Sequence, residues 1–82
     1  MPAVSQPLTA LAVGQSGTVL DVRAEPKRRS RLMELGLVPG TAVELVRFAL
    51  LGDPVEIKVR GYNLTVPRHE AEQIWVSGPA GD

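Results

Sequence analysis

The sequence contains no cysteine among its 82 residues. This absence excludes a disulfide, a thiolate nucleophile and a thiolate metal ligand. Aromatic side chains are also scarce, because there is only one Phe, one Trp and one Tyr. Packing of aliphatic side chains must therefore hold the domain together, and the lack of cysteine suits a reducing cytoplasm.

The sequence also lacks an excess of positive or negative side chains. Nine Lys and Arg residues balance nine Asp and Glu residues, whereas a dedicated nucleic-acid-binding domain carries a clear basic excess. The sequence has no apolar run of about 18 residues that would span a membrane, and residues 1–15 lack the features of a secretory signal. We therefore expect a cytoplasmic protein with no nucleic-acid partner and no direct membrane insertion.

Glycine and proline divide the chain into short segments. Eight glycines and seven prolines separate segments of about five to eight residues, which is the pattern of a small barrel. We expect residues 1–7 to form a flexible lead-in and residues 77–82 a flexible tail. Residues 8–76 then form one domain, because the chain is too short for two.

The strands are predicted from β-branched residues and from alternation. Val55, Ile57 and Val59 alternate with charged residues, so this segment has one inward face and one outward face. By the same criteria we predict five strands, over residues 17–23, 41–48, 55–60, 62–67 and 74–76.

A helix is predicted over residues 27–35, after the first strand. Pro26 suits the first helical position because the N–H that it lacks would have no partner there. Gly36 suits the left-handed residue that ends a helix. Helical spacing places Arg28, Leu32 and Leu35 on one side of the helix. Because only the two leucines are apolar, the apolar face is limited to the second half of the helix.

Helical turns are also predicted at residues 8–11 and 68–73, near the two ends of the domain. The fold class that follows is mostly β. We predict a small SH3-like barrel of five strands that is partly open, with one short helix inserted after the first strand.

Little in the sequence supports catalysis. There is one histidine and no glycine-rich phosphate loop, so we expect no catalytic residue, no cofactor and no enzymatic activity. His69 and Glu72 are three residues apart on a predicted helical turn and are weak candidates for metal ligands. Two ligands make a poor site, because structural zinc takes four. We favour the interpretation that Glu70 and Glu72 stabilise the start of a short helix.

A group of arginines is the first candidate for a partner contact. Arg28, Arg29 and Arg31 lie in the first turns of the predicted helix. Positive charge there interacts unfavourably with the helix dipole and lowers helix stability by about 0.3–1 kcal/mol per residue. An acidic partner surface or phosphate groups would offset this effect. A solvated helical face is an equally favoured alternative.

Apolar side chains outside the predicted core are the second candidate. Leu50 and Leu51 are adjacent in a predicted loop, where we expect one to enter the core and the other to contact a partner. Trp75 points outward from the last strand. Tryptophan is enriched at binding hot spots, although covering a barrel edge is its commoner use.

Three blocks of sequence resemble the FeoA family of small cytosolic accessory proteins in bacterial ferrous iron uptake. They follow in the family's order and cover about four-fifths of the chain. The resemblance implies an SH3-like barrel and a role beside FeoB, a membrane transporter of ferrous iron with a cytosolic GTP-binding domain. The blocks are Leu8–Val22 (LTALAVGQSGTVLDV), Arg28–Leu45 (RRSRLMELGLVPGTAVEL) and Leu51–Val76 (LGDPVEIKVRGYNLTVPRHEAEQIWV).

The resemblance implies an accessory or regulatory protein that docks on the cytosolic GTP-binding domain of FeoB, at the inner face of the membrane. The alternative is a stimulator of GTP hydrolysis that supplies Arg28, Arg29 or Arg31 to stabilise transition-state charge. Direct iron binding and nucleic-acid binding are less favoured, and weak self-association stays open.

Overall fold

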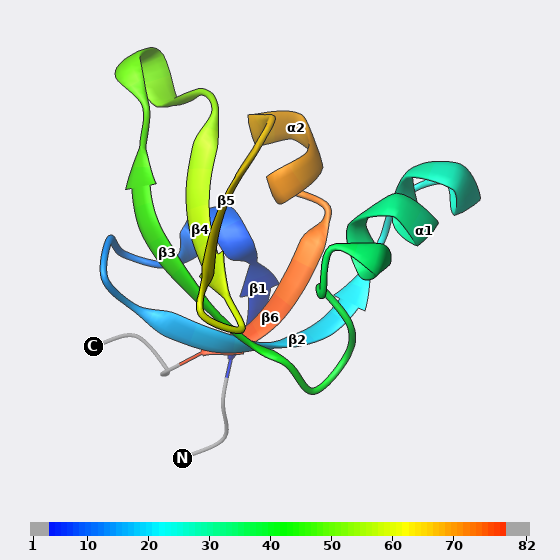
Figure 1. Ribbon diagram of the computed structural model, residues 1–82. Coiled ribbons are helices and arrows are strands. Elements are labelled where there is room, and N and C mark those ends of the chain that lie inside the picture. The colour runs from blue at the N-terminus through cyan, green and yellow to red at the C-terminus, as the bar shows by residue number, and fades with distance from the viewer. Residues whose placement is uncertain (1–3, 79–82) are drawn as a thin grey trace.

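A computed structural model describes residues 4–78, which form one curved antiparallel sheet with short helices at its edges and between its strands. The strand order in the sheet is β1-β6-β2-β3-β4-β5. Figure 1 shows the sheet curving around an interior that the strands enclose on most sides. The strands are β1 (Val4–Pro7), β2 (Ser16–Val22), β3 (Ala42–Phe48), β4 (Val55–Val59), β5 (Tyr62–Val66) and β6 (Ile74–Gly78).

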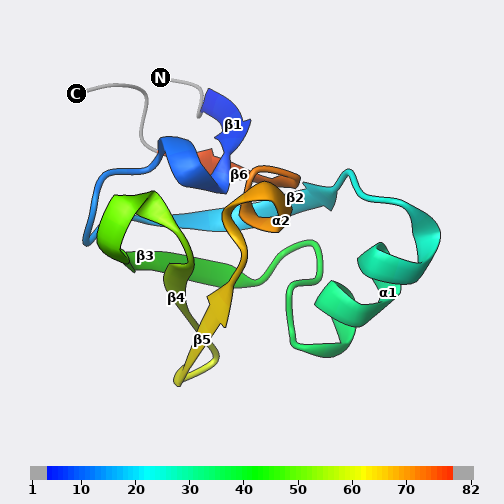
Figure 2. The same ribbon diagram turned by 90° about the horizontal axis from the view of Figure 1, so that it is seen from above.

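Four helical segments connect the strands. Of these, α1 and α2 are α-helices, and the other two are single 3-10 turns. Figure 2 shows α1 standing off to one side of the sheet, whereas α2 lies near the middle of the molecule. The segments are η1 (Leu8–Ala10), α1 (Pro26–Glu34), η2 (Leu50–Gly52) and α2 (Arg68–Ala71).

The mostly-β fold is confirmed, and the described residues hold six strands where five were expected. Residues 4–7 were expected to be flexible, but they form β1, which pairs with β6. Ser77 and Gly78, expected in the flexible tail, belong to β6. The reason is that β6 pairs with β2 on one edge, and β1 forms hydrogen bonds with the backbone groups on its other edge. Pro7 is tolerated because β1 lies at the edge of the sheet. Residues 1–3 and 79–82 lie outside the described residues.

The core is aliphatic, as the composition requires. The alternation predicted in β4 is confirmed, because Val55, Ile57 and Val59 are all essentially inaccessible to solvent. Neighbouring strands contribute their inward residues to the same cluster. The other buried apolar residues are Leu8, Leu11, Val19, Val22, Leu32, Leu37, Val43, Leu45, Val66, Ala71, Ile74 and Val76.

The end of α1 is fixed by a backbone reversal at Gly36. Gly36 has a φ of 108° and donates to the carbonyl of Met33 at 3.0 Å, while the N–H of Leu37 donates to the carbonyl of Leu32 at 3.2 Å. This pair of bonds is a Schellman motif, and its usual apolar contact joins Leu32 to Leu37. Leu35 was predicted on the apolar side, but it is 46% exposed. The reversal brings Leu37 into the core in its place.

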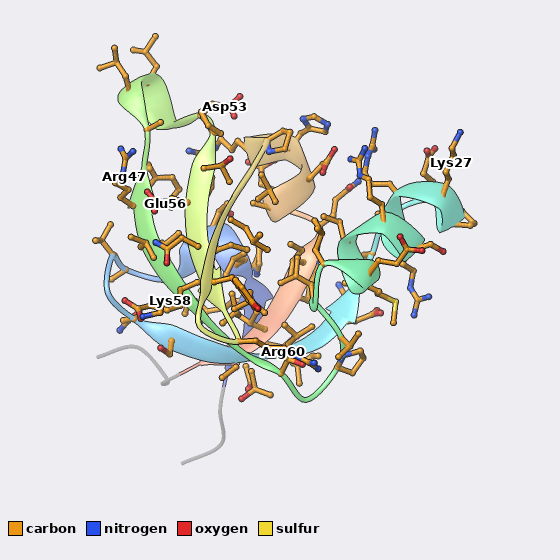
Figure 3. All side chains as sticks on the ribbon, viewed as in Figure 1. Lys27, Arg47, Asp53, Glu56, Lys58 and Arg60 are labelled. Atoms are coloured by element: carbon orange, nitrogen blue, oxygen red, sulfur yellow. The ribbon has the colours of Figure 1, made fainter. Side chains whose placement is uncertain are left out.

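The outward face of the sheet carries a polar network centred on Glu56. Arg47 Nε donates to Glu56 Oε1 at 2.8 Å, and Asn63 Nδ2 donates to Glu56 Oε2 at 2.7 Å. Figure 3 shows Arg47 and Glu56 together, far from Lys27 on α1. The hydrogen bond from Asn63 has the largest effect on the pKa of Glu56 and, together with the smaller effect of the hydrogen bond from Arg47, holds it below its ordinary value of 4.5.

This network predicts an acid-dependent contribution to stability. Because the pKa of Glu56 is lowered in the folded state, its contribution is present above pH 4.5 and is lost as the pH falls through the folded-state pKa. We expect the difference in unfolding free energy between the wild type and Glu56→Gln to shrink from about pH 5 to about pH 3. Urea denaturation across this range checks it, and a difference that stays constant to the lowest pH would contradict it.

Candidate partner-binding site

Glu70 on α2 is a buried carboxylate that binds two arginines of α1. Only 5% of Glu70 is exposed. Arg31 Nη2 donates to Glu70 Oε2 at 2.6 Å, and Arg28 Nε lies 3.4 Å from the same oxygen. A buried charge without a partner is strongly destabilising. The three side chains therefore form one unit that joins α1 to α2.

The spacing within α1 explains which arginines take part. Arg28 and Arg31 are three residues apart and so lie on the same side of the helix, which faces α2. Arg29 points elsewhere, is exposed, and makes no ion pair within residues 4–78. The three arginines were expected to act as one group, but the structure separates them into a bound pair and a solvated side chain. Glu70 therefore compensates the positive charges of Arg28 and Arg31, which are unfavourable near the start of a helix.

A hollow of about 280 Å³ opens between α1 and α2. Its walls come from the start of α1 and from Glu70 on α2. Glu25 precedes the helix and makes no capping hydrogen bond with its side chain. The lining residues are Glu25, Lys27, Arg28, Arg31 and Glu70.

Leu50 and Leu51 form an exposed apolar tip, which we call the leucine tip. It lies in η2, at the end of the hairpin formed by β3 and β4. Leu50 is 87% exposed and Leu51 is 96% exposed. The expectation that one of them enters the core is therefore wrong. The reason is that η2 extends past the end of the sheet, away from the interior that the strands enclose, as Figure 1 shows.

Arg68 at the start of α2 holds the base of the leucine tip. Its backbone N–H donates to Asp53 Oδ1 at 2.9 Å, and its Nη1 donates to the carbonyl of Gly52 at 3.3 Å. Its guanidinium lies 5.3 Å from the ring centre of Phe48. Gly52 has a φ of 83°, a backbone conformation that favours glycine, and a Cβ at this position would lie 2.8 Å from Nη1, which would have to shift.

Helix α2 therefore connects the leucine tip to α1. Arg68 binds one side and Glu70 binds the other. Figures 1 and 2 agree that α2 lies between η2 and α1. Sequence reasoning missed the roles of both residues. For Glu70 the local sequence offers no signal, because α2 is a single turn and the apolar residues on either side of it, Val66 and Ile74, belong to strands.

The other predicted site residues lie apart or have different partners. Trp75 is half-buried on β6, with the guanidinium of Arg23 4.0 Å from its ring centre. Glu72 binds Arg68 Nε at 3.3 Å, whereas His69 Nε2 lies 4.0 Å from Glu70 Oε2. In the part of the chain that the structure describes, no group of three or more His, Cys, Asp or Glu side chains is placed to hold a metal.

Among residues 4–78, no helix has the length and apolar character needed to cross a bilayer.

Residues 6–78 match the profile of the FeoA domain family. The chain is also 32% identical, over 69 residues, to a fusion of Fe(2+) transport protein A with the Fe(2+) transporter FeoB from Porphyromonas gingivalis. The match covers 84% of this chain but only 8% of the fusion protein.

Solved structures of FeoA proteins are similar in fold. The FeoA protein from Chlorobium tepidum is 48% identical with a TM-score of 0.85, over 94% of this chain and 73% of that one. The zinc complex of Stenotrophomonas maltophilia FeoA, described as a prokaryotic SH3 domain protein, is 28% identical with a TM-score of 0.75, over 90% of this chain and 89% of that one. The SH3-like fold predicted from the sequence is confirmed by this similarity.

The buried position of Glu70 predicts an unequal effect of two similar substitutions. Arg31 and Arg47 are 61% and 62% exposed, and each binds one glutamate. We expect Arg31→Ala to lower the unfolding free energy by about 1–3 kcal/mol, because it weakens the pairing of a buried charge. Arg47→Ala should lower it by about 0–1 kcal/mol. Urea denaturation measures both, and equal losses would refute the structural role assigned to Glu70.

Proposed function

The chain belongs to the FeoA family, and we propose that it is an accessory binding protein that docks on the cytosolic GTP-binding domain of a FeoB-type ferrous iron transporter. The fusion protein of Porphyromonas gingivalis supports this proposal, since it carries a FeoA-like part and a FeoB part in one polypeptide. Such a fusion keeps two modules at high effective concentration. In this proposal the chain acts in the cytoplasm, at the inner face of the membrane through its partner.

The observation that carries the docking proposal is the leucine tip. Adjacent, almost fully exposed leucines are unfavourable in water and are typical of interaction sites. Burying one leucine side chain is worth about 1.5–3 kcal/mol. Two such side chains supply a substantial part of the free energy of a moderate protein complex.

The attachment of the tip to α2 makes it suitable for binding. Arg68 contacts both Gly52 and Asp53 at the base of the tip. A loop that is ordered before it binds loses less conformational entropy on association. Arg68 therefore acts as a positioning residue for Leu50 and Leu51.

The alternative function, stimulation of GTP hydrolysis, would depend on one particular arginine. An arginine that stabilises transition-state charge must reach into the site of a partner. Glu70 holds Arg28 and Arg31 beside α2, so neither can extend into the site of a partner without breaking its ion pair, whereas Arg29 is exposed and unpaired in the described region. Arg29 is therefore the arginine that this alternative requires.

The docking proposal predicts that the leucine tip controls affinity. The double variant Leu50→Ser/Leu51→Ser should bind the isolated cytosolic domain of the transporter at least about 100-fold more weakly, a loss of about 2.7 kcal/mol. Its thermal stability should be unchanged, because both side chains are solvated in the free protein. Val13→Ser is the matched control, since Val13 is 61% exposed in a different loop. Calorimetry measures the affinities, and a double variant that binds like the wild type would contradict the proposal.

The two candidate functions predict different effects on GTP turnover. If the chain only docks, the turnover rate of the GTP-binding domain stays the same when the chain is added at saturating concentration. If it supplies Arg29, the rate rises, and Arg29→Ala abolishes the rise without weakening binding. A rise that survives in Arg29→Ala would exclude the arginine mechanism.

A further inference from the structure

The hollow between α1 and α2 has an unbalanced charge. Lys27, Arg28 and Arg31 carry three positive charges, whereas Glu25 and Glu70 carry two negative charges. We propose that this hollow receives one acidic side chain of the partner protein. The proposal rests on the function proposed above, because it assigns a second contact to the same partner.

The two guanidinium groups retain donors for a second carboxylate. Each has five N–H donors, yet Arg31 and Arg28 both approach a single oxygen of Glu70, Oε2. Arg31 in particular is largely exposed. No other hydrogen bond of these two side chains occurs within residues 4–78. The remaining N–H groups are therefore available to an acceptor that enters the hollow.

Glu70 prepares the arginines for binding. A free arginine loses rotamer entropy when it is immobilised at an interface, at about 0.5–1.5 kcal/mol per side chain. Here the buried carboxylate of Glu70 already restrains Arg28 and Arg31 in the free protein. An incoming carboxylate can then form the short, charge-assisted hydrogen bonds that arginine makes with this group.

The charge of the lining favours a carboxylate over a phosphate. A single negative charge neutralises the net single positive charge of the hollow. A phosphate dianion would instead leave the hollow with a net negative charge beside the carboxylates of Glu25 and Glu70. The occupant that fits is therefore an aspartate or glutamate of the partner.

The hollow and the leucine tip give the partner surface a required pattern. The η2 turn carries the tip, and α1 carries most of the lining of the hollow; Figures 1 and 2 show these two elements on either side of α2. The partner must then present an apolar recess for the tip and, across the width of α2, an acidic residue for the hollow. The apolar contact supplies most of the affinity, while the charge contact fixes orientation and accelerates association.

The first test uses a peptide and needs no transporter. The chain is titrated with hexaglutamate, with hexaglutamine as the control peptide, and the Nε–H signals of its arginines are followed by NMR. We expect the signals of Arg28 and Arg31 to shift with hexaglutamate alone, and that of Arg47 to stay in place. Equal shifts at Arg47 would indicate diffuse surface attraction and overturn the inference. Larger shifts with inorganic phosphate at the same ionic strength would overturn it as well.

The second test measures affinity for the isolated cytosolic domain of the transporter at several salt concentrations. We expect Lys27→Gln and Arg31→Gln each to weaken binding by about three- to tenfold and to reduce its salt dependence. Lys27→Gln leaves the Arg31–Glu70 pair intact and so controls for instability. Arg47→Gln should bind like the wild type.

The outcomes separate the two proposals. If the leucine variants weaken binding but the Lys27 and Arg31 variants do not, the hollow has no role and docking through the tip stands. If the wild-type chain does not bind the domain at all, the proposed function fails. The peptide titration then decides alone whether the hollow accepts a carboxylate.

Discussion

The pairing of Glu70 with Arg28 and Arg31 is the interaction on which the candidate site depends. A carboxylate that is 5% exposed is stable only when neighbouring groups compensate its charge, and two arginines of α1 do so here. Few apolar residues attach α1 to the core, namely Leu32, the partly buried Met33, and Leu37 just beyond the helix. The ion pair therefore sets the position of the helix against α2, and with it the shape and charge of the hollow.

A single turn of helix organises the whole face. Arg68 begins α2 and holds the base of the leucine tip, while Glu70 in the same turn holds α1. Pro67 precedes the turn, and Ala71 packs into the core at its end. Because core packing fixes α2, the two contacts that it makes place an apolar tip and a cationic hollow in one defined arrangement. Such preorganisation suits a protein that binds a partner.

Helices and strands could be predicted wherever the sequence has a local pattern. Alternation over Val55–Val59 requires one inward face, and Pro26 with Gly36 marks the limits of α1. Residues 4–7 have no comparable pattern, because four residues with a proline show no useful period. They form a strand only because β6 offers them an edge. The exposure of the leucine tip was also outside sequence reasoning, since it depends on how far the β3–β4 hairpin extends past the sheet.

The sequence by itself determined the mostly-β class, the limits of α1 and the family, because these follow from residue order and from local backbone preference. It also identified the arginines and the paired leucines as unusual. Only the tertiary structure decided which of them act together. Arg31 and Glu70 are 39 residues apart in the chain, and no local rule brings them into contact. Their approach follows from closure of the sheet around the core, and the helical spacing within α1 then leaves Arg29 solvated.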